Sequence, residues 1–79
     1  MMKLPLAMLP ENEEARVVEV RGGRGLVRRL SELGFSPGAK VKILFSNSPG
    51  TAIVDVRGSR IALGRGLLMR IMVDLEVES

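Results

Sequence analysis

Apolar and polar side chains alternate along several short stretches of this chain, which is the pattern of half-buried β-strands. The stretches, some of them rich in β-branched residues, are 15–21, 40–45, 51–57 and 69–77. In the second of these, Val41, Ile43 and Phe45 fall on one face, and we expect that face to pack into the core. A further short strand is predicted over residues 60–63, directly after a turn.

Residues 24–33 carry apolar side chains at the spacing of an amphipathic helix. The apolar positions are Leu26, Val27, Leu30 and Leu33. We expect Leu30 and Leu33 to anchor this helix in the core. Gly34 follows the last apolar position and can adopt the left-handed conformation that commonly ends a helix.

A tight turn is predicted after the helix. Pro37 and Gly38 stand at the second and third positions of a four-residue stretch. Proline fixes φ and glycine accepts a positive φ, so this pair predicts a type II turn. The turn directs the chain into the strand that begins at residue 40.

A hairpin is predicted around Gly58 and Ser59, which fit the two central positions of a type II′ turn. That register places Arg57 opposite Arg60. It also places four large apolar residues on one face of the hairpin: Val54, Val56, Ile61 and Leu63.

Five short strands with one small helix between the first two predict a mainly β fold, a small five-stranded SH3-like barrel. Closure removes exposed strand edges in a chain too short for two sheets. An OB-fold is the alternative, although its helix normally lies between the third and fourth strands. We expect residues 1–79 to form one domain, with residues 1–14 as a lead-in that packs on the barrel.

The chain has no cysteine and no histidine. Disulfides, thiolate and imidazole metal sites, cysteine nucleophiles and a Ser-His-Asp triad are therefore excluded, and we expect no tight metal site and no cofactor. Paired carboxylates are the remaining enzymatic option, with the candidates Glu11, Glu13, Glu14, Asp74, Glu76 and Glu78. A solvated strand face and a polar lead-in explain these acids more simply, so we do not expect an enzyme.

Two glycine-rich stretches and three methionines invite other interpretations. Residues 21–25 and 64–66 lack the Lys-Ser/Thr pair of a phosphate-binding loop, and we interpret them as turns. Met8, Met69 and Met72 could act as soft metal ligands, but methionine at such positions more often fills space.

The formal net charge is +3, and acidic residues are interleaved with basic ones along most of the chain. One stretch is dense in arginine: Arg16, Arg21, Arg24, Arg28 and Arg29. A free-standing barrel that binds nucleic acid through this stretch is therefore the alternative function. The chain has no tryptophan or tyrosine to form a base-stacking platform, which disfavours that alternative.

No stretch approaches the roughly 20 continuous apolar residues of a transmembrane helix. Two prolines within residues 1–10, and acidic residues after them, distinguish this segment from a signal peptide. We expect a cytoplasmic protein without direct membrane insertion.

Three apolar residues fall on the wrong face of their strands: Leu44, Ile53 and Met72. Something is expected to cover them. The lead-in is one candidate cover, because it offers three leucines that need a place to pack: Leu4, Leu6 and Leu9. Another molecule, either a partner protein or a second copy, is the other candidate. In that case Arg57 and Arg60, at the hairpin tip, join the candidate partner surface.

Residues 29–38 read RLSELGFSPG, which resembles the RLxELGxxPG signature of the FeoA family, small cytoplasmic proteins associated with bacterial ferrous iron uptake. The resemblance extends to the family's first strand at residues 17–23, its GxxxAL hairpin at 58–63 and its closing strand at 71–73. The chain departs from the family pattern at residues 67–69 and 11–13.

The resemblance implies an SH3-like fold, which is also the C-terminal domain of DtxR-type metal-dependent repressors. It also implies a partnership with FeoB, a membrane transporter that carries a cytosolic GTPase domain. The expected function is an accessory or regulatory protein of ferrous iron transport that contacts FeoB. The motif residues are expected to be structural: Leu30, Leu33, Gly34, Pro37, Gly38 and Gly58.

Overall fold

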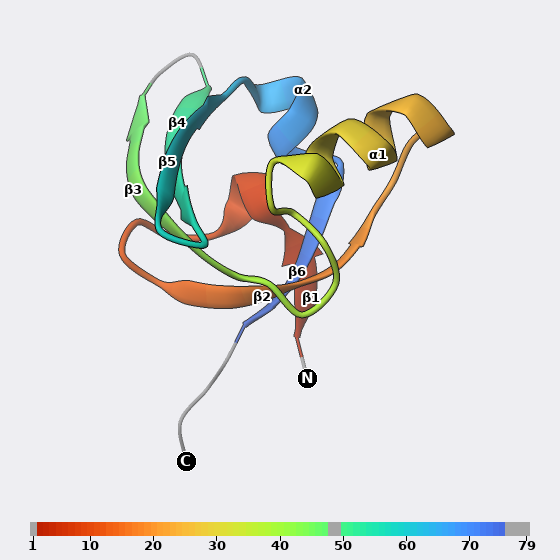
Figure 1. The fold of residues 1–79 in the computed structure, drawn as a ribbon. Coiled ribbons are helices and arrows are strands. Elements are labelled where there is room, and N and C mark those ends of the chain that lie inside the picture. Colours follow the sequence, from red (N-terminus) through yellow and green to blue (C-terminus); the bar gives the residue numbers. More distant parts are fainter. Residues whose placement is uncertain (1, 48–49, 76–79) are drawn as a thin grey trace.

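The computed structural model describes residues 2–47 and 50–75, which form a mainly β structure (Figure 1). In chain order, the elements of this part are β1 (Lys3–Pro5), the 3-10 helix η1 (Leu6–Met8), β2 (Glu14–Val20), α1 (Arg24–Glu32), β3 (Lys40–Asn47), β4 (Thr51–Val56), β5 (Ser59–Leu63), α2 (Arg65–Leu68) and β6 (Ile71–Leu75).

The six strands form one antiparallel sheet in the order β1-β6-β2-β3-β4-β5. The sheet curves strongly, with β3, β4 and β5 together on one side (Figure 1). β1 and β5 are the outer strands, so the sheet is open, whereas the sequence predicted a closed five-stranded barrel. Closure of the predicted barrel would pair β5 with the outer edge of β6, but β1 occupies that edge. The predicted helix is confirmed as α1, which connects β2 and β3.

The lead-in contains a strand that the sequence did not predict. β1 pairs with β6 and places Pro5 opposite Met72. A proline, which cannot donate a ladder hydrogen bond, made a strand unexpected here, but proline is tolerated on an edge strand and β1 ends at Pro5. The following leucines, Leu6 and Leu9, are 0% and 5% exposed. The lead-in therefore supplies part of the core.

Apolar side chains from the strands and helices fill the inside of the curved sheet. The largest fully buried ones are Phe35, Leu6, Leu30, Ile43, Ile71, Val41, Val54, Val56 and Val73. Leu30 anchors α1 as predicted. Leu33, by contrast, is 42% exposed, so its predicted role as a core anchor is wrong. Because α1 ends at Glu32 and the chain reverses at Gly34, Phe35 enters the core instead.

The helix exit and the following turn have the predicted backbone. Gly34 has φ +111° and Gly38 has φ +90°. The N–H of Ala39 donates to the Ser36 carbonyl at 3.0 Å, which closes the four-residue turn that contains Pro37.

The β4–β5 hairpin turns through Arg57 and Gly58, one residue earlier than predicted. Their φ values are +51° and +81°, as in a type I′ turn, which matches the twist of the flanking strands. Arg60 therefore lies opposite Asp55, and the predicted Arg57–Arg60 pair is wrong. The pairing differs from the prediction by two positions, so the apolar residues keep the same face.

A bulge alters the far end of β3. The pairing with β4 shifts between Ile43 and Phe45, so that Phe45 lies opposite Ile53 and Leu44 is the extra residue. Phe45 is 55% exposed, so its predicted place on the core face is wrong. A one-residue insertion moves every later side chain to the other face.

Both α-helices are short. α2 occupies residues that the sequence predicted as a simple turn, and β6 begins at Ile71 rather than at residue 69. The predicted end of that strand, residue 77, lies outside the described residues. No helix within the described residues is long and apolar enough to cross a membrane.

Candidate functional site

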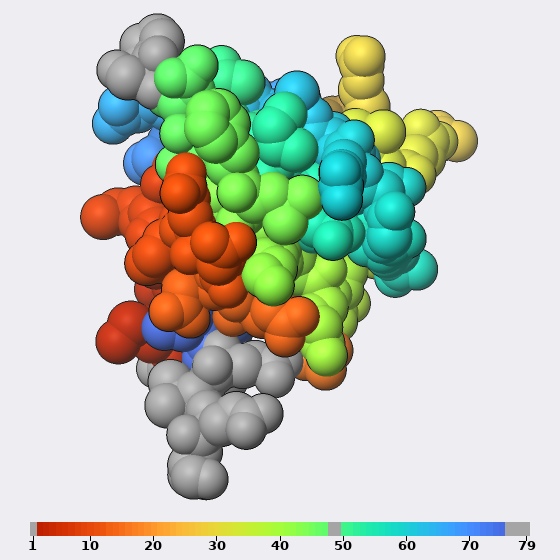
Figure 2. All heavy atoms as spheres, turned by 90° about the vertical axis from the view of Figure 1, so that its left-hand side faces the viewer, coloured from red at the N-terminus to blue at the C-terminus, as the bar shows by residue number. Residues whose placement is uncertain are grey.

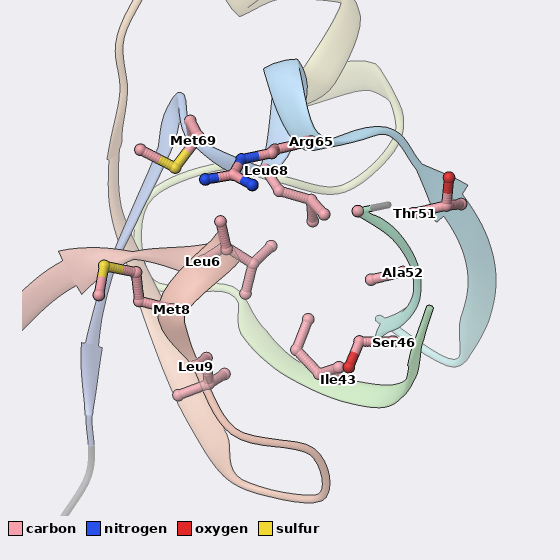
Figure 3. A pocket seen from close by; sticks show the side chains of 12 residues that line it. Leu6, Met8, Leu9, Ile43, Ser46, Thr51, Ala52, Arg65, Leu68 and Met69 are labelled. Atoms are coloured by element: carbon pink, nitrogen blue, oxygen red, sulfur yellow. The ribbon is translucent and has the colours of Figure 1, made fainter. Parts of the chain in front are cut away.

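A pocket of about 350 Å³ lies between η1, α2 and the ends of β3 and β4 that meet beside it (Figure 3). Its lining residues are Leu6, Ala7, Met8, Leu9, Ile43, Ser46, Gly50, Thr51, Ala52, Arg65, Leu68 and Met69. This volume is at the small end of the range of about 300–1,000 Å³ that is usual for ligand pockets. The pocket is the candidate functional site of the chain.

Buried apolar side chains form the inner wall of the pocket. Leu6 and Leu9 come from the N-terminal segment, and Leu68 comes from α2. Ile43 and Ala52 come from β3 and β4 and also belong to the core. These wall residues all belong to the core, so the pocket is built into the fold.

Arg65 carries the one charge among these twelve lining residues. Its side chain runs from α2 across the pocket, toward Leu6 and Met69 (Figure 3). The aliphatic stem lies against Gly50: a Cβ built on Gly50 would stand 3.0 Å from the Arg65 Cβ and 3.3 Å from its Cδ. The missing side chain of Gly50, which has φ +137°, therefore makes room for Arg65.

Two methionines stand at the mouth of the pocket. Met8 is 66% exposed and Met69 is 43% exposed. Methionine is flexible and polarisable, and it is common on surfaces that adapt to different apolar ligands. The apolar surface thus continues outward from the pocket.

The polar edge of the pocket is held by an internal hydrogen-bond pair. Glu11 Oε2 accepts the backbone N–H of Ser46 at 2.7 Å and its hydroxyl at 3.1 Å. Glu11, one of the carboxylates considered above, thus holds the end of β3 in place.

The residues of the predicted partner surface do not form one patch in the structure. Leu44 and Ile53 are half-buried on the outer face of β3 and β4, the face seen in Figure 2. The exposed Phe45 and Ala62 lie beside Ile53 on this face, because each pairs with it across a strand. Met72 is only 6% exposed and lies on β6 opposite Pro5, so the lead-in is its neighbour. No strand pairing joins Met72 to the other two residues.

A row of alternating charges crosses the same outer face. Across four neighbouring strands, the paired positions are Glu14, Lys42, Asp55 and Arg60. Opposite charges at directly paired positions stabilise a sheet. Arg57 is outside this row, in the hairpin turn, and its Nη2 donates to the Ser36 hydroxyl at 3.2 Å.

The arginine-rich stretch makes contacts within the chain. Arg21 Nε lies 2.8 Å from a Glu19 carboxylate oxygen, and Arg28 Nε lies 3.9 Å from Glu32. Arg16 Nη1 donates to the Gly38 carbonyl at 2.9 Å. These contacts give three of the five arginines an intramolecular role.

The hydrogen bond from Arg21 holds the pKa of Glu19 below its usual range, and a second one from Lys3, at 3.2 Å, acts in the same direction. Because Glu19 is accessible to water, this is a modest surface effect.

The acidic candidates do not form a metal cluster in the described part of the chain. There, no three acidic side chains come close enough together to hold an ion. Asp74 accepts the backbone N–H of Met2 at 3.1 Å, which ties β6 to the segment before β1. Glu76 and Glu78 lie outside the described residues.

The pocket was not predicted from the sequence. The stretch around Arg65 was predicted to be a turn, and Met8 and Met69 were interpreted as packing residues. Arg65 and Met69 lie around one glycine-rich turn, but Met8 is far from them in the sequence, and only the fold brings the three residues together.

Comparisons with known proteins agree with this fold. The FeoA domain family matches residues 4–75. A protein named as an Fe(2+) transport protein A, from Methanocaldococcus jannaschii, is 43% identical over 70 residues, which are 89% of this chain and 84% of that protein.

Two solved structures have the same architecture. A crystal structure of an iron uptake regulatory protein, FeoA, has a TM-score of 0.85 and 36% identity, covering 91% of this chain and 96% of that one. A zinc complex of Stenotrophomonas maltophilia FeoA, described as a prokaryotic SH3 domain protein, has a TM-score of 0.78 and 30% identity, covering 90% and 89%. The predicted SH3-like fold is thus confirmed. With its signature at the exit of α1, its open six-stranded sheet and these matches, the chain belongs to the FeoA family.

Proposed function

We propose that this chain is a cytoplasmic accessory protein that regulates ferrous iron transport through contact with the FeoB transporter. The observation that carries the proposal is the pocket between η1 and α2, which has an apolar inner wall and is bordered by exposed methionines and one arginine. Such a surface is suited to binding another protein.

The relatives supply the biological context. The Methanocaldococcus jannaschii protein is named for Fe(2+) transport, and the crystal structure of similar fold is named for iron uptake regulation. The composition is consistent with a role through protein contact. Without histidine or cysteine, the chain offers iron only carboxylate, carbonyl, hydroxyl and thioether groups.

The direct test measures binding of the full chain to detergent-solubilised FeoB and to its isolated cytosolic portion, by biolayer interferometry at physiological salt. We expect saturable binding, and we expect ferrous iron uptake by cells lacking this protein to recover when the chain is supplied. Failure to bind in both formats, together with normal uptake in the deficient cells, would contradict the proposal.

A nucleic-acid control distinguishes the alternative function, binding of nucleic acid, from the proposed contact with FeoB. Binding to duplex DNA of mixed sequence is measured at 50 and 200 mM salt. A protein that uses several arginine–phosphate contacts loses affinity by orders of magnitude over such a range. We expect little binding at either salt concentration. Tight DNA binding with that salt dependence would favour the nucleic-acid function instead.

A further inference from the structure

We infer that the pocket between η1 and α2 receives one large apolar side chain from an acidic segment of a partner protein. The inference rests on the proposed function for the identity of that partner. The chemistry of the segment follows from the pocket itself.

The apolar requirement comes from the inner wall. Leu6, Leu9 and Leu68 are each at most 5% exposed, although they line an opening of about 350 Å³. These side chains cannot move inward because the core behind them is packed. A leucine, methionine or phenylalanine from a partner would bury its own apolar surface against this wall, whereas a polar side chain would lose its hydration without compensation.

The acidic requirement comes from Arg65. Its guanidinium lies over an apolar wall, and no carboxylate of the described chain lies within ion-pair distance of it. Because its stem is held against Gly50, the guanidinium loses less conformational entropy on binding than a freely rotating arginine would. A carboxylate next to the inserted apolar side chain would complement it. The net charge of +3 favours approach of such a segment as well.

The two methionines favour a protein segment over a small molecule. Met8 and Met69 line the mouth of the pocket and remain 66% and 43% exposed. A small carboxylic acid that filled the pocket would leave this outer apolar surface in water. A polypeptide segment would fill the pocket and cover the methionines together, which uses the whole patch.

The test uses the full chain labelled with ¹⁵N and a set of capped hexapeptides. Each peptide has one central residue, either leucine, phenylalanine or alanine, between flanks that are acidic, neutral or basic. Binding is measured from shifts of the backbone amide signals of Leu9, Ala52 and Met69. Octanoate is titrated in parallel as a small carboxylate.

We expect the acidic leucine and phenylalanine peptides to bind most tightly and to shift these three amide signals. Replacing the central residue with alanine is expected to weaken binding at least about thirtyfold, since most of the buried apolar area is lost. Arg65→Gln is expected to weaken binding of the acidic peptides about three- to tenfold, and to leave the neutral peptides unchanged.

Gly50→Ala and Gly66→Ala form a matched pair. A Cβ at position 50 meets the Arg65 side chain, whereas a Cβ at position 66, next to Arg65 in α2, meets nothing within 4 Å. Gly50→Ala is expected to weaken the binding of acidic peptides to the same degree as Arg65→Gln. Gly66→Ala is expected to leave this binding unchanged. Amide spectra of both variants show whether the fold is retained.

The inference is overturned if no acidic apolar peptide shifts the pocket amides at millimolar concentration, if basic peptides bind as tightly, or if octanoate alone binds. FeoB binding is measured on Arg65→Gln as a separate readout. If that variant binds FeoB normally, the proposed function stands but the pocket is not its contact. If the wild-type chain does not bind FeoB while peptides fill the pocket, the proposed function fails and the pocket chemistry stands.

Discussion

The backbone N–H of Phe35 donates a hydrogen bond of 2.9 Å to the carbonyl of Leu30, and both side chains are 1% exposed. The N–H of Gly34 donates to the Ser31 carbonyl, also at 2.9 Å. This pair of bonds is the Schellman motif, in which apolar residues at these two positions pack together. The end of α1 is thereby fixed to the core at one point.

Leu30→Ala is expected to destabilise the fold by about 2–5 kcal/mol, because it empties a fully buried position. Leu33→Ala removes the same atoms from a side chain that is 42% exposed, and its cost is expected to be below about 1 kcal/mol. Urea unfolding followed by circular dichroism compares the two. Equal losses would contradict the phase of α1 seen in the structure.

Gly34→Ala is expected to cost about 1–2 kcal/mol. The residue has φ +111°, and a Cβ there would stand 3.3 Å from Val56 Cγ2. Gly25→Ala is the matched control, since a Cβ at this position of α1 meets nothing within 4 Å. That control is expected to gain about 0.5–1 kcal/mol from helix propensity. The two unfolding free energies should therefore move in opposite directions.

Arg60→Glu places a negative charge directly opposite Asp55 and is expected to destabilise the sheet by about 0.2–1 kcal/mol. Arg57→Glu makes the same change in net charge within the turn, where no residue lies opposite, and is expected to cost less. Added salt should reduce the difference between the two variants. If the Arg57 variant lost more stability at low salt, the observed register would be wrong.

Arg57→Asn is expected to stabilise the hairpin by about 0.5–1 kcal/mol, although it gives up the contact with Ser36. Arg57 has φ +51°, and asparagine tolerates this conformation better at the first central position of a type I′ turn. Arg60→Asn, in the neighbouring strand, serves as the control and should not stabilise. Thermal unfolding at neutral pH measures both changes, and a lower Tm for Arg57→Asn would contradict the turn type.

Glu19 should make folding slightly sensitive to acid. Its pKa is lower in the folded chain than in the unfolded chain because of Arg21 and Lys3, so its ion pairs stabilise the fold at every pH above the unfolded pKa. This contribution is lost as the pH falls through the folded pKa. The difference in unfolding free energy between the chain and Glu19→Gln should thus be present at pH 6 and vanish near pH 2. A difference that persists at pH 2 would contradict this origin.

Local signals predicted the elements that depend on nearby residues. Gly34 ends α1 and Gly38 completes the turn before β3, because a positive φ at a glycine is decided within a few residues. The hairpin register could not be chosen this way. Two registers that differ by two positions put the same apolar side chains on the same face. The conformation of the turn at Arg57 and Gly58 decides which of the two registers forms.

Features that depend on contacts between distant parts of the chain were missed. Leu44 and Phe45 are both apolar, so the alternation of apolar and polar residues does not show which of the two faces the core. The bulge at Leu44 therefore leaves no mark in the pattern. The pocket depends on the approach of Arg65 to Gly50 from a different element. No periodicity in the sequence encodes that approach, because strand pairing and α2 set it together.

Residues 6–9 form one wall of the pocket, and residues from β3, β4 and α2, together with Gly50 and Met69, form the rest. The N-terminal wall is held to the sheet by β1, by the hydrogen bond from Met2 to Asp74 and by burial of Leu6 and Leu9. Occupancy of the pocket and attachment of this segment are therefore one thermodynamically linked equilibrium. A ligand present at one hundred times its Kd would resist detachment of the segment by about 2.7 kcal/mol. A change that loosens β1 would in turn lower the apparent affinity for the ligand in proportion to the fraction of molecules in which the segment stays attached.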